Sequence, residues 1–269
     1  MMDTTMWFFV VCLVLGCCVG LLAGLLGIGG GLLIVPTLSS VLPWAGISSP
    51  ILIMPMALAT SLASIVITSL SSALSHYRLG NVQPYVIKAL LPSLLMGGVI
   101  GSVIADRLPV NYLPRIFGGI VWMLALQMMF SLRAETARTL SFTTAHVLNG
   151  CIIGILSSLV GIGGGSFTVP YLTYCGIKMH KAIGTASFCG VFLAAAGMSS
   201  FIVLGLSQPE PLFKYSVGYV YLPALIGITT TSVFTTKYGA KLASRLSTSI
   251  IKRIFAVFLL LVGARMFLT

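Results

Sequence analysis

The stretch Leu25–Pro36 reads LLGIGGGLLIVP, and a near-copy, LVGIGGGSFTVP, occupies Leu159–Pro170. Both copies place three consecutive glycines shortly before a proline. Each glycine costs a helix about 1 kcal/mol relative to alanine. The two GIGGG motifs, at 27–31 and 161–165, therefore predict two places at which a helix breaks.

The rest of the chain has the composition of a membrane protein. Of its 269 residues, 58% are hydrophobic and 7% are charged, whereas a typical soluble domain is about 25% charged. Several apolar runs reach about 20 residues, the length that crosses a bilayer as a helix. A β-barrel would instead show alternating segments of about ten residues. We therefore predict an all-α polytopic membrane protein, with one membrane domain in the cell inner membrane.

Apolar runs predict eight transmembrane helices, at about 7–27, 51–75, 85–105, 110–131, 143–161, 182–206, 216–236 and 249–268. Two shorter apolar pieces, about 31–43 and 165–176, follow the glycine clusters and are expected to be half-helices or re-entrant segments. The first run lacks the basic segment of a signal peptide, since Asp3 is the only charge before Arg78. We expect it to be a retained helix.

The second half of the chain repeats landmarks of the first in the same order. The two GIGGG motifs align, and so do the pairs Thr60 and Thr185, Pro92 and Pro223, and Arg115 and Arg253. This order predicts two homologous halves of four helices each, 1–134 and 135–269. Internal repeats are typical of transporters. Whether the halves are parallel or inverted stays open, because it depends on whether one element of each half is re-entrant.

Charge and motifs exclude several functions. The net charge is +11, but the basic residues flank helices, as topology requires, and no nucleic-acid-binding motif is present. The six cysteines form no CxxC pair, so they predict helix packing rather than a metal site. Catalytic and nucleotide-binding signatures such as HExxH, GxSxG and GxxxxGK[ST] are missing from the sequence. We expect neither an enzyme nor a cofactor.

The glycine clusters are the first candidate binding site. A broken helix exposes backbone N–H groups at the start of the next helix, and these groups together with the helix dipole favour an anion. Two such breaks that meet would form a cradle from Gly29, Gly30, Gly31, Gly163, Gly164 and Gly165, with Pro36 and Pro170 marking the breaks. The alternative is close helix packing, which we favour for GGVIG at 97–101.

Hydroxyl side chains are the next candidates. Thr60, Ser61, Thr185 and Ser187 lie deep in the second and sixth predicted helices and could donate hydrogen bonds to an anion. The alternative is a hydroxyl bonded back to its own helix. Acidic residues fall near connections, at Asp106, Glu135 and Glu210, which argues against a cation pump or a metal cage.

Histidines and basic residues at helix ends are the last candidates. His76 ends the second predicted helix and His180 precedes the sixth, and both titrate in the physiological range. They are read either as proton-coupling groups or as interfacial residues. Lys181 serves either to attract anions or to anchor the topology.

Four segments together resemble the sulfite exporter TauE/SafE family of membrane transporters. They are GLLGIGGGLLIVPTL, SLVGIGGGSFTVPYL, HKAIGTASF and HYRLGNV, and the resemblance covers nearly the whole chain. It implies about eight helices in two homologous halves and transport of a sulfur-containing anion, such as sulfite or an organosulfonate, coupled to an ion gradient. It points to both glycine clusters with their prolines and to Thr60 and Thr185, and it draws attention to His76, Arg78 and Lys181.

One departure makes the two half-sites unequal. Pro55 and Met56 stand where the second half has His180 and Lys181. We therefore expect an asymmetric cavity, with the anionic head of the substrate directed toward the second half.

The sequence thus predicts a secondary transporter that moves a small sulfur-containing anion by alternating access. An anion channel, a carboxylate transporter and a non-transporting membrane scaffold stay as alternatives. The particular anion, import versus export, a proton or sodium as the coupling ion, the orientation of the termini and a homodimeric state are left open.

Overall fold

Helices account for most of the chain in the computed structural model, which describes residues 2–26, 30–47, 49–130, 144–208, 213–243 and 248–268. In chain order the elements are α1 (Met2–Leu26), α2 (Gly31–Val41), the short 3₁₀ turn η1 (Leu42–Ala45), α3 (Pro50–Arg78), α4 (Pro84–Arg107), α5 (Tyr112–Phe130), α6 (Thr144–Leu159), α7 (Gly165–Tyr174), α8 (Met179–Leu206), β1 (Ser216–Val217), β2 (Val220–Tyr221), α9 (Leu222–Ala243) and α10 (Thr248–Leu268).

Within these ranges, five helices are long and apolar enough to cross a bilayer: α1, α3, α4, α5 and α8. The helices α3, α4 and α8 begin and end within three residues of the predicted runs. The protein is therefore a multi-pass membrane protein. Eight crossings stay a prediction, because α6 has 16 residues and a helix needs about 20 to span the hydrocarbon core.

The prediction of a helix from 216 was wrong at its start. Residues 216–221 form a two-stranded antiparallel hairpin in which Ser216 pairs with Tyr221 and Val217 with Val220, and α9 begins only at Leu222. Valine and tyrosine favour strands as well as apolar helices, and Gly218 supplies the positive φ of 53° in the turn. The Tyr219 hydroxyl donates to Asp106 at 2.8 Å, so the hairpin is tied to the last turn of α4. Burial and this carboxylate raise the pKa of Tyr219.

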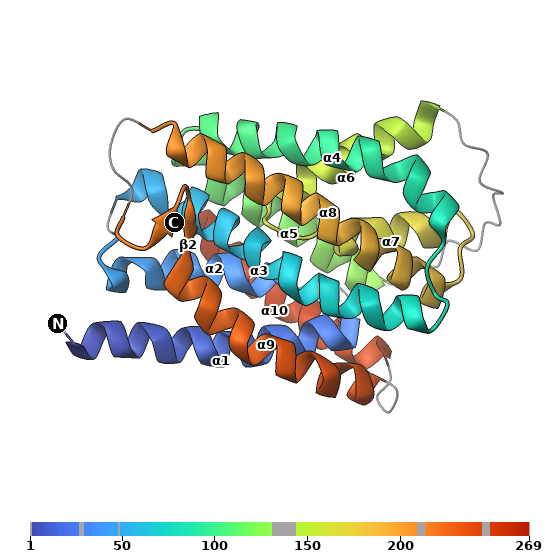
Figure 1. The fold of residues 1–269 in the computed structure, drawn as a ribbon, viewed down its shortest axis with the longest axis horizontal. Helices are drawn as coiled ribbons and strands as arrows, with labels where there is room; N and C mark the ends of the chain where they lie inside the picture. The colour runs from blue at the N-terminus through green and yellow to red at the C-terminus, as the bar shows by residue number, and fades with distance from the viewer. Residues whose placement is uncertain are drawn as a thin grey trace.

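The directions of the helices answer the topological question that the sequence left open. Figure 1 shows both termini at the same end of the bundle, on the left, and the end of α5 and the start of α6 at the opposite end. In this view α1, α3, α5 and α9 run from left to right, whereas α4, α6, α8 and α10 run back. Each long helix of the first predicted half is therefore antiparallel to its counterpart in the second.

The packing pairs follow the same correspondence. The most extensive contacts join α1 to α9, α4 to α6, α3 to α8 and α5 to α10, followed by α4 with α8 and α3 with α9. The short helices α2 and α7 pack on α3 and α8 respectively. If each of the helices α1–α5 is replaced by its counterpart among α6–α10, and the reverse, the same set of packing pairs results. The first helix of each predicted half, α1 or α6, thus packs on a helix of the other predicted half.

Glycines permit the two closest of these crossings. An added Cβ on Gly20 of α1 would lie 2.4 Å from the carbonyl oxygen of Ser232 on α9. The corresponding atom on Gly154 of α6 would lie 2.5 Å from the carbonyl oxygen of Leu94 on α4. A Cβ on Gly97 would lie 2.1 Å from the Cys151 carbonyl oxygen, so the packing interpretation of GGVIG is confirmed. Small residues allow helix backbones to approach closely in membranes.

We expect Gly154→Ala to destabilise the protein by about 1–3 kcal/mol, since its methyl group would meet backbone atoms that cannot move independently of α4. Thermal unfolding in detergent measures the effect. The control is Gly119→Ala in α5, where the nearest atom to an added Cβ is 3.8 Å away. The control should be neutral or stabilising by up to about 1 kcal/mol. Equal melting temperatures for the two variants would contradict the packing argument.

Candidate functional site

Both short helices begin on a glycine in the left-handed conformation. Gly30 precedes α2 with φ 79°, and Gly164 precedes α7 with φ 77°. Residues 160–164 of the second motif lie outside α6 and α7. Of the first motif, 27–29 lie outside the described residues, so nothing is said of Gly29. Glycine suits both positions because it adopts positive φ without steric cost.

The two motifs lie against each other. An added Cβ on Gly31 would lie 2.3 Å from the carbonyl oxygen of Gly161, so the start of α2 touches the backbone of the second motif. Ser61 of α3 donates a buried hydrogen bond of 2.7 Å to the same oxygen. Two predicted site residues, Gly31 and Ser61, therefore meet at Gly161, two residues before the predicted Gly163.

Four buried hydroxyls lie on the two helices that flank the second motif. Ser157 and Ser158 end α6, whereas Ser166 and Thr168 belong to the first turn of α7. Their side-chain oxygens are buried and have no hydrogen-bond partner among the described residues. Each buried unsatisfied polar group costs about 1–3 kcal/mol. Each of these groups needs a hydrogen-bond partner, which a buried water or a bound ligand can supply.

The positions of these hydroxyls follow from the glycines around them. A Cβ built on Gly164 would lie 3.6 Å from Thr168 Oγ1 and 3.8 Å from Ser157 Oγ, so both hydroxyls flank the glycine that begins α7. A Cβ on Gly197 of α8 would lie 3.2 Å from Ser158 Oγ. Among the described residues, no side chain caps α7. Ser157 and Thr168 thus lie beside the start of α7, whereas Ser158 faces Gly98 of α4 and Gly197 of α8.

The first motif has no such cluster. Where the second copy has Ser157, Ser158, Ser166 and Thr168, the same offsets from the first copy give Ala23, Gly24, Leu32 and Ile34. Leu32 and Ile34 are fully buried, and Gly30 faces Val19. The two half-sites are therefore chemically unequal, but through residues that the sequence analysis did not select. Comparing the two copies position by position for hydroxyls could have found them.

Thr60 and Thr185 each accept a hydrogen bond from the backbone at the start of another helix, and their place in a binding site stays a prediction. Thr60 Oγ1 accepts the backbone N–H of Tyr221 at 3.0 Å, and Thr185 Oγ1 accepts that of Gln83 at 3.0 Å. Both threonines are completely buried. Tyr221 directly precedes α9, and Gln83 precedes α4, at opposite ends of the bundle (Figure 1). The structure therefore places the matched threonines apart, each anchoring the start of a helix of the other half.

Ser187 lies on the interface between α3 and α8. Its hydroxyl is 3.3 Å from that of Ser72, and either oxygen can be the donor. This contact joins the two long central helices. It includes none of the hydroxyls of Ser157, Ser158, Ser166 and Thr168.

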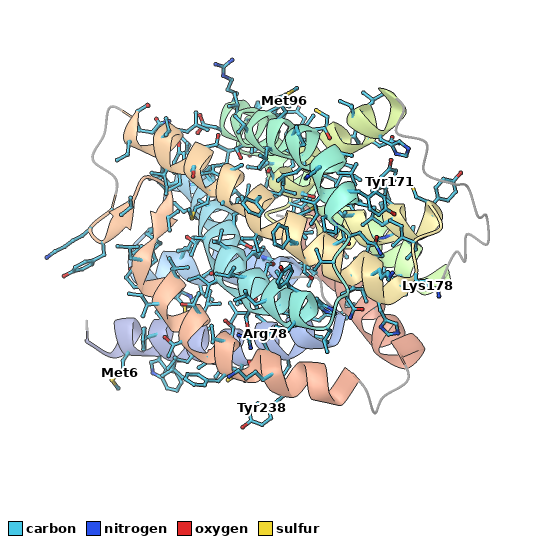
Figure 2. All side chains as sticks on the ribbon, turned by 45° about the vertical axis from the view of Figure 1, so that its right-hand side comes forward. Met6, Arg78, Met96, Tyr171, Lys178 and Tyr238 are labelled. Atoms are coloured by element: carbon cyan, nitrogen blue, oxygen red, sulfur yellow. The ribbon has the colours of Figure 1, made fainter. Side chains whose placement is uncertain are left out.

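The basic candidates gather at one end of the bundle. His76 and Arg78 end α3, while His180 and Lys181 begin α8, and Figure 2 labels Arg78 and the neighbouring Lys178. His76 and His180 thus lie where α3 ends and α8 begins, at the same end of the bundle (Figure 1). His76 is 15 residues beyond Ser61, which is about 22 Å along a helix. These groups are therefore remote from the place where the two motifs meet.

Comparison with known proteins gives the class and then the family. Curated relatives include proteins described as a "Probable membrane transporter protein" from Haemophilus influenzae, 44% identical over 97% of this chain and 98% of the relative, and from Methanocaldococcus jannaschii, 25% identical over 87% and 86%. The protein is a membrane transporter. Residues 12–266 match the family described as "Sulfite exporter TauE/SafE", and the chain belongs to that family. No solved structure matches it.

We expect Thr60→Val to lower stability by about 1–3 kcal/mol, because the buried N–H of Tyr221 would lose its acceptor. Thr60→Ser keeps the hydroxyl and should retain most of the stability, and Thr185→Val should behave like Thr60→Val. Thermal unfolding of the purified variants measures this. Loss of transport by Thr60→Val with an unchanged melting temperature would instead support direct contact with substrate.

Proposed function

We propose that the protein is a secondary transporter of a small sulfur-containing anion, sulfite or an organosulfonate, in the cell inner membrane. The observation that carries this proposal is the set of four buried hydroxyls on α6 and α7 that have no hydrogen-bond partner among the described residues, two of them beside the uncapped start of α7. A substrate that accepts their hydrogen bonds would remove the cost of burying them. The family's printed description, a sulfite exporter, agrees with this substrate class.

The donor set suits an oxyanion with several oxygens. Hydroxyls donate one hydrogen bond each, and the N-terminus of a helix adds N–H groups and a favourable dipole. A sulfonate or sulfite presents three oxygens in a pyramidal arrangement, and the hydroxyls of Ser157, Ser158, Ser166 and Thr168 come from two different helices. A carboxylate presents two oxygens in one plane and would satisfy fewer of these donors.

Neutral donors also suit a substrate that must be released. A fixed cation beside the anion would strengthen binding further, because charge-assisted hydrogen bonds are roughly twice as strong as neutral ones. The basic residues Arg78, His180 and Lys181 are exposed at the bundle end. We propose that they attract anions there while hydroxyls and backbone N–H groups hold the anion inside.

Alternating access would use the two predicted halves, which we propose are the inverted repeats 1–134 and 135–269. The antiparallel directions in Figure 1 and the exchange of helix pairs support this division. Transporters built from inverted repeats move one part against another around a fixed site. The contact of Gly31 with Gly161 lies between the halves, so such a movement would change the surroundings of α7.

Ion coupling is the least direct part of the proposal. His76 and His180 lie together at one end of the bundle, and we propose that their protonation couples a proton to transport, with sodium as the alternative ion. Because they are remote from the start of α7, their coupling would act through movement of α3 against α8 rather than through contact with the anion.

Flux into proteoliposomes tests the proposal. Sulfite, sulfoacetate, taurine and an aromatic sulfonate would be compared with matched carboxylates, with and without pH or sodium gradients. We expect gradient-driven accumulation of one sulfur anion and little movement of its carboxylate counterpart. Downhill flux of every anion at channel-like rates would replace the carrier with an anion channel. A purified protein that moves none would favour a scaffold.

We expect Thr168→Val to raise the KM of transport about tenfold or more, since a hydrogen bond to a charged group contributes about 1.5–3 kcal/mol. Its melting temperature without substrate should be equal or higher, because a buried unsatisfied hydroxyl is removed.

The matched control is Thr173→Val on the same helix, whose hydroxyl donates to the carbonyl oxygens of Val169 at 3.0 Å and Pro170 at 2.8 Å. It should leave KM within about twofold of the unmodified protein. Equal KM values for the two variants would remove Thr168 from the site.

A further inference from the structure

A cavity lies at the end of the bundle that holds both termini. Its volume is about 840 Å³, and its walls come from α2, α3, α5 and α10 with the connections beside them. Cavities of about 300–1,000 Å³ are typical of small-molecule sites. None of its lining residues belongs to α6 or α7, so the cavity is separate from the hydroxyls proposed to hold the transported anion.

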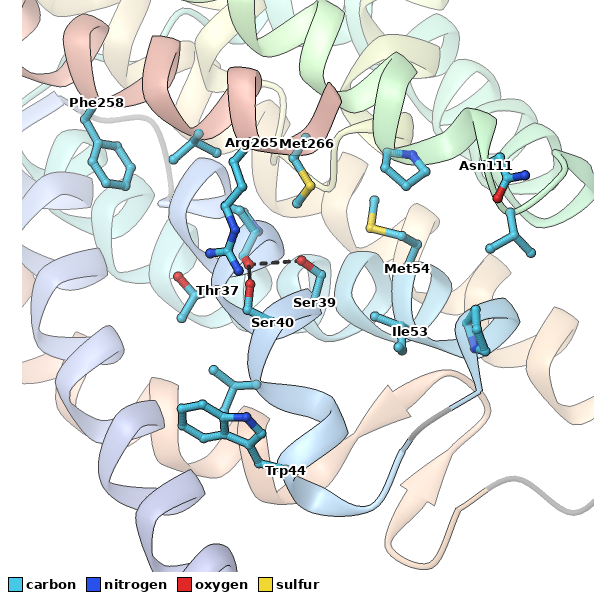
Figure 3. A pocket seen from close by; sticks show the side chains of 16 residues that line it. Thr37, Ser39, Ser40, Trp44, Ile53, Met54, Asn111, Phe258, Arg265 and Met266 are labelled. Atoms are coloured by element: carbon cyan, nitrogen blue, oxygen red, sulfur yellow. Dashed lines mark hydrogen bonds between the residues drawn. The ribbon is translucent and has the colours of Figure 1, made fainter. Parts of the chain in front are cut away.

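One wall of this cavity carries positive charge. Arg265 of α10 is the charged residue among those that line it. Figure 3 shows its side chain reaching from α10 toward Thr37 and Ser40 of α2. A guanidinium group presents five N–H donors in a planar fork that matches the oxygens of an oxyanion.

The hydroxyls beside Arg265 are not equivalent. Ser39 and Ser40 donate to the carbonyl oxygen of Pro36 at 2.9 and 2.8 Å, drawn as dashed lines in Figure 3. A serine hydroxyl has one proton to donate, so these two oxygens are left as acceptors. The hydroxyl of Thr37 is then the α2 side chain suited to assist Arg265 in binding an anion.

The rest of the lining is largely apolar. Ile53 and Met54 of α3 face the cavity together with Phe258 and Met266 of α10. Trp44 also lines it and is 54% exposed, as is common for tryptophan at a membrane interface. A cationic group at one side and an apolar surface at the other match an amphiphilic ligand.

We propose that this cavity binds an organic oxyanion, a sulfonate or a phosphate ester with an apolar body, whose oxygens contact Arg265 and Thr37. A soluble organic anion and the headgroup of an anionic phospholipid share this chemistry. The apolar part of either ligand packs on Met54, Phe258 and Met266. The inference does not depend on the proposed transport function, since it rests on another set of helices.

Binding to the purified chain in nanodiscs tests this, in the Thr168→Val background to weaken the α7 site. One arm measures equilibrium binding of labelled naphthalene-2-sulfonate in phosphatidylcholine nanodiscs. The other counts phosphatidylglycerol molecules retained by the chain in native mass spectrometry. We expect one ligand per chain in at least one arm. The naphthalene-2-sulfonate arm identifies a soluble anion, and the phosphatidylglycerol arm identifies a lipid.

Arg265→Gln should weaken that binding about tenfold or more, and Thr37→Val should weaken it severalfold. Two controls should remain within about twofold: Ser40→Ala, whose proton is already used, and Lys214→Gln, a basic residue in the segment before β1 that does not line the cavity. Ile53→Trp, which fills the cavity and keeps Arg265, should also abolish binding, and melting curves verify that each variant is folded. Binding that is equally strong in Arg265→Gln and Lys214→Gln, or absent in both arms, overturns the proposal.

Discussion

The structure depends on how a membrane protein satisfies backbone groups where a helix is broken. Inside a bilayer, an unpaired N–H or carbonyl must find a partner within the protein or in water. Here the second break meets the start of α2, and the Gly161 carbonyl accepts a hydrogen bond from Ser61. A side chain at Gly31 would separate the two, since its Cβ would lie 2.3 Å from that oxygen. The glycines therefore make possible both the breaks and their contact.

The packing of the two predicted halves on each other also depends on what a membrane protein can use in place of the hydrophobic effect. Lipid tails are as apolar as the helices, so association relies on close packing and on hydrogen bonds between helices. The glycine crossings of α1 with α9 and of α4 with α6 provide the first. Thr60 and Thr185 provide the second, since each accepts an N–H at the start of a helix in the other half. The helix packing described here does not use the hydroxyls of Ser157 and Thr168, which have no hydrogen-bond partner among the described residues.

The two anion sites proposed here differ in how they reconcile affinity with function. Around α7 the donors are neutral and buried, which suits an anion that binds and is then released. In the cavity lined by Arg265 a full positive charge faces an exposed tryptophan and apolar walls, which suits an amphiphile at the membrane interface. Both rest on side chains that do not stand out in the sequence, because a single arginine or serine is common in any helix.

The sequence by itself determined the class of the protein and most of its helices. The length of an apolar segment and the glycines that break a helix are local properties, and the bilayer thickness sets the length that a segment needs. It missed the hairpin before α9, because valine and tyrosine occur both in strands and in apolar helices. The turn at Gly218 is what makes the segment a hairpin. It also assigned Thr60 and Thr185 to a common site, although their partners, Tyr221 and Gln83, lie at opposite ends of the bundle. Only the tertiary structure decided that the long helices of the two predicted halves run antiparallel, and that Ser157 and Thr168 lie on either side of Gly164. The reason is that the role of a hydroxyl depends on the residues that the fold brings near it. Those residues are distant in the chain, so local sequence does not identify them.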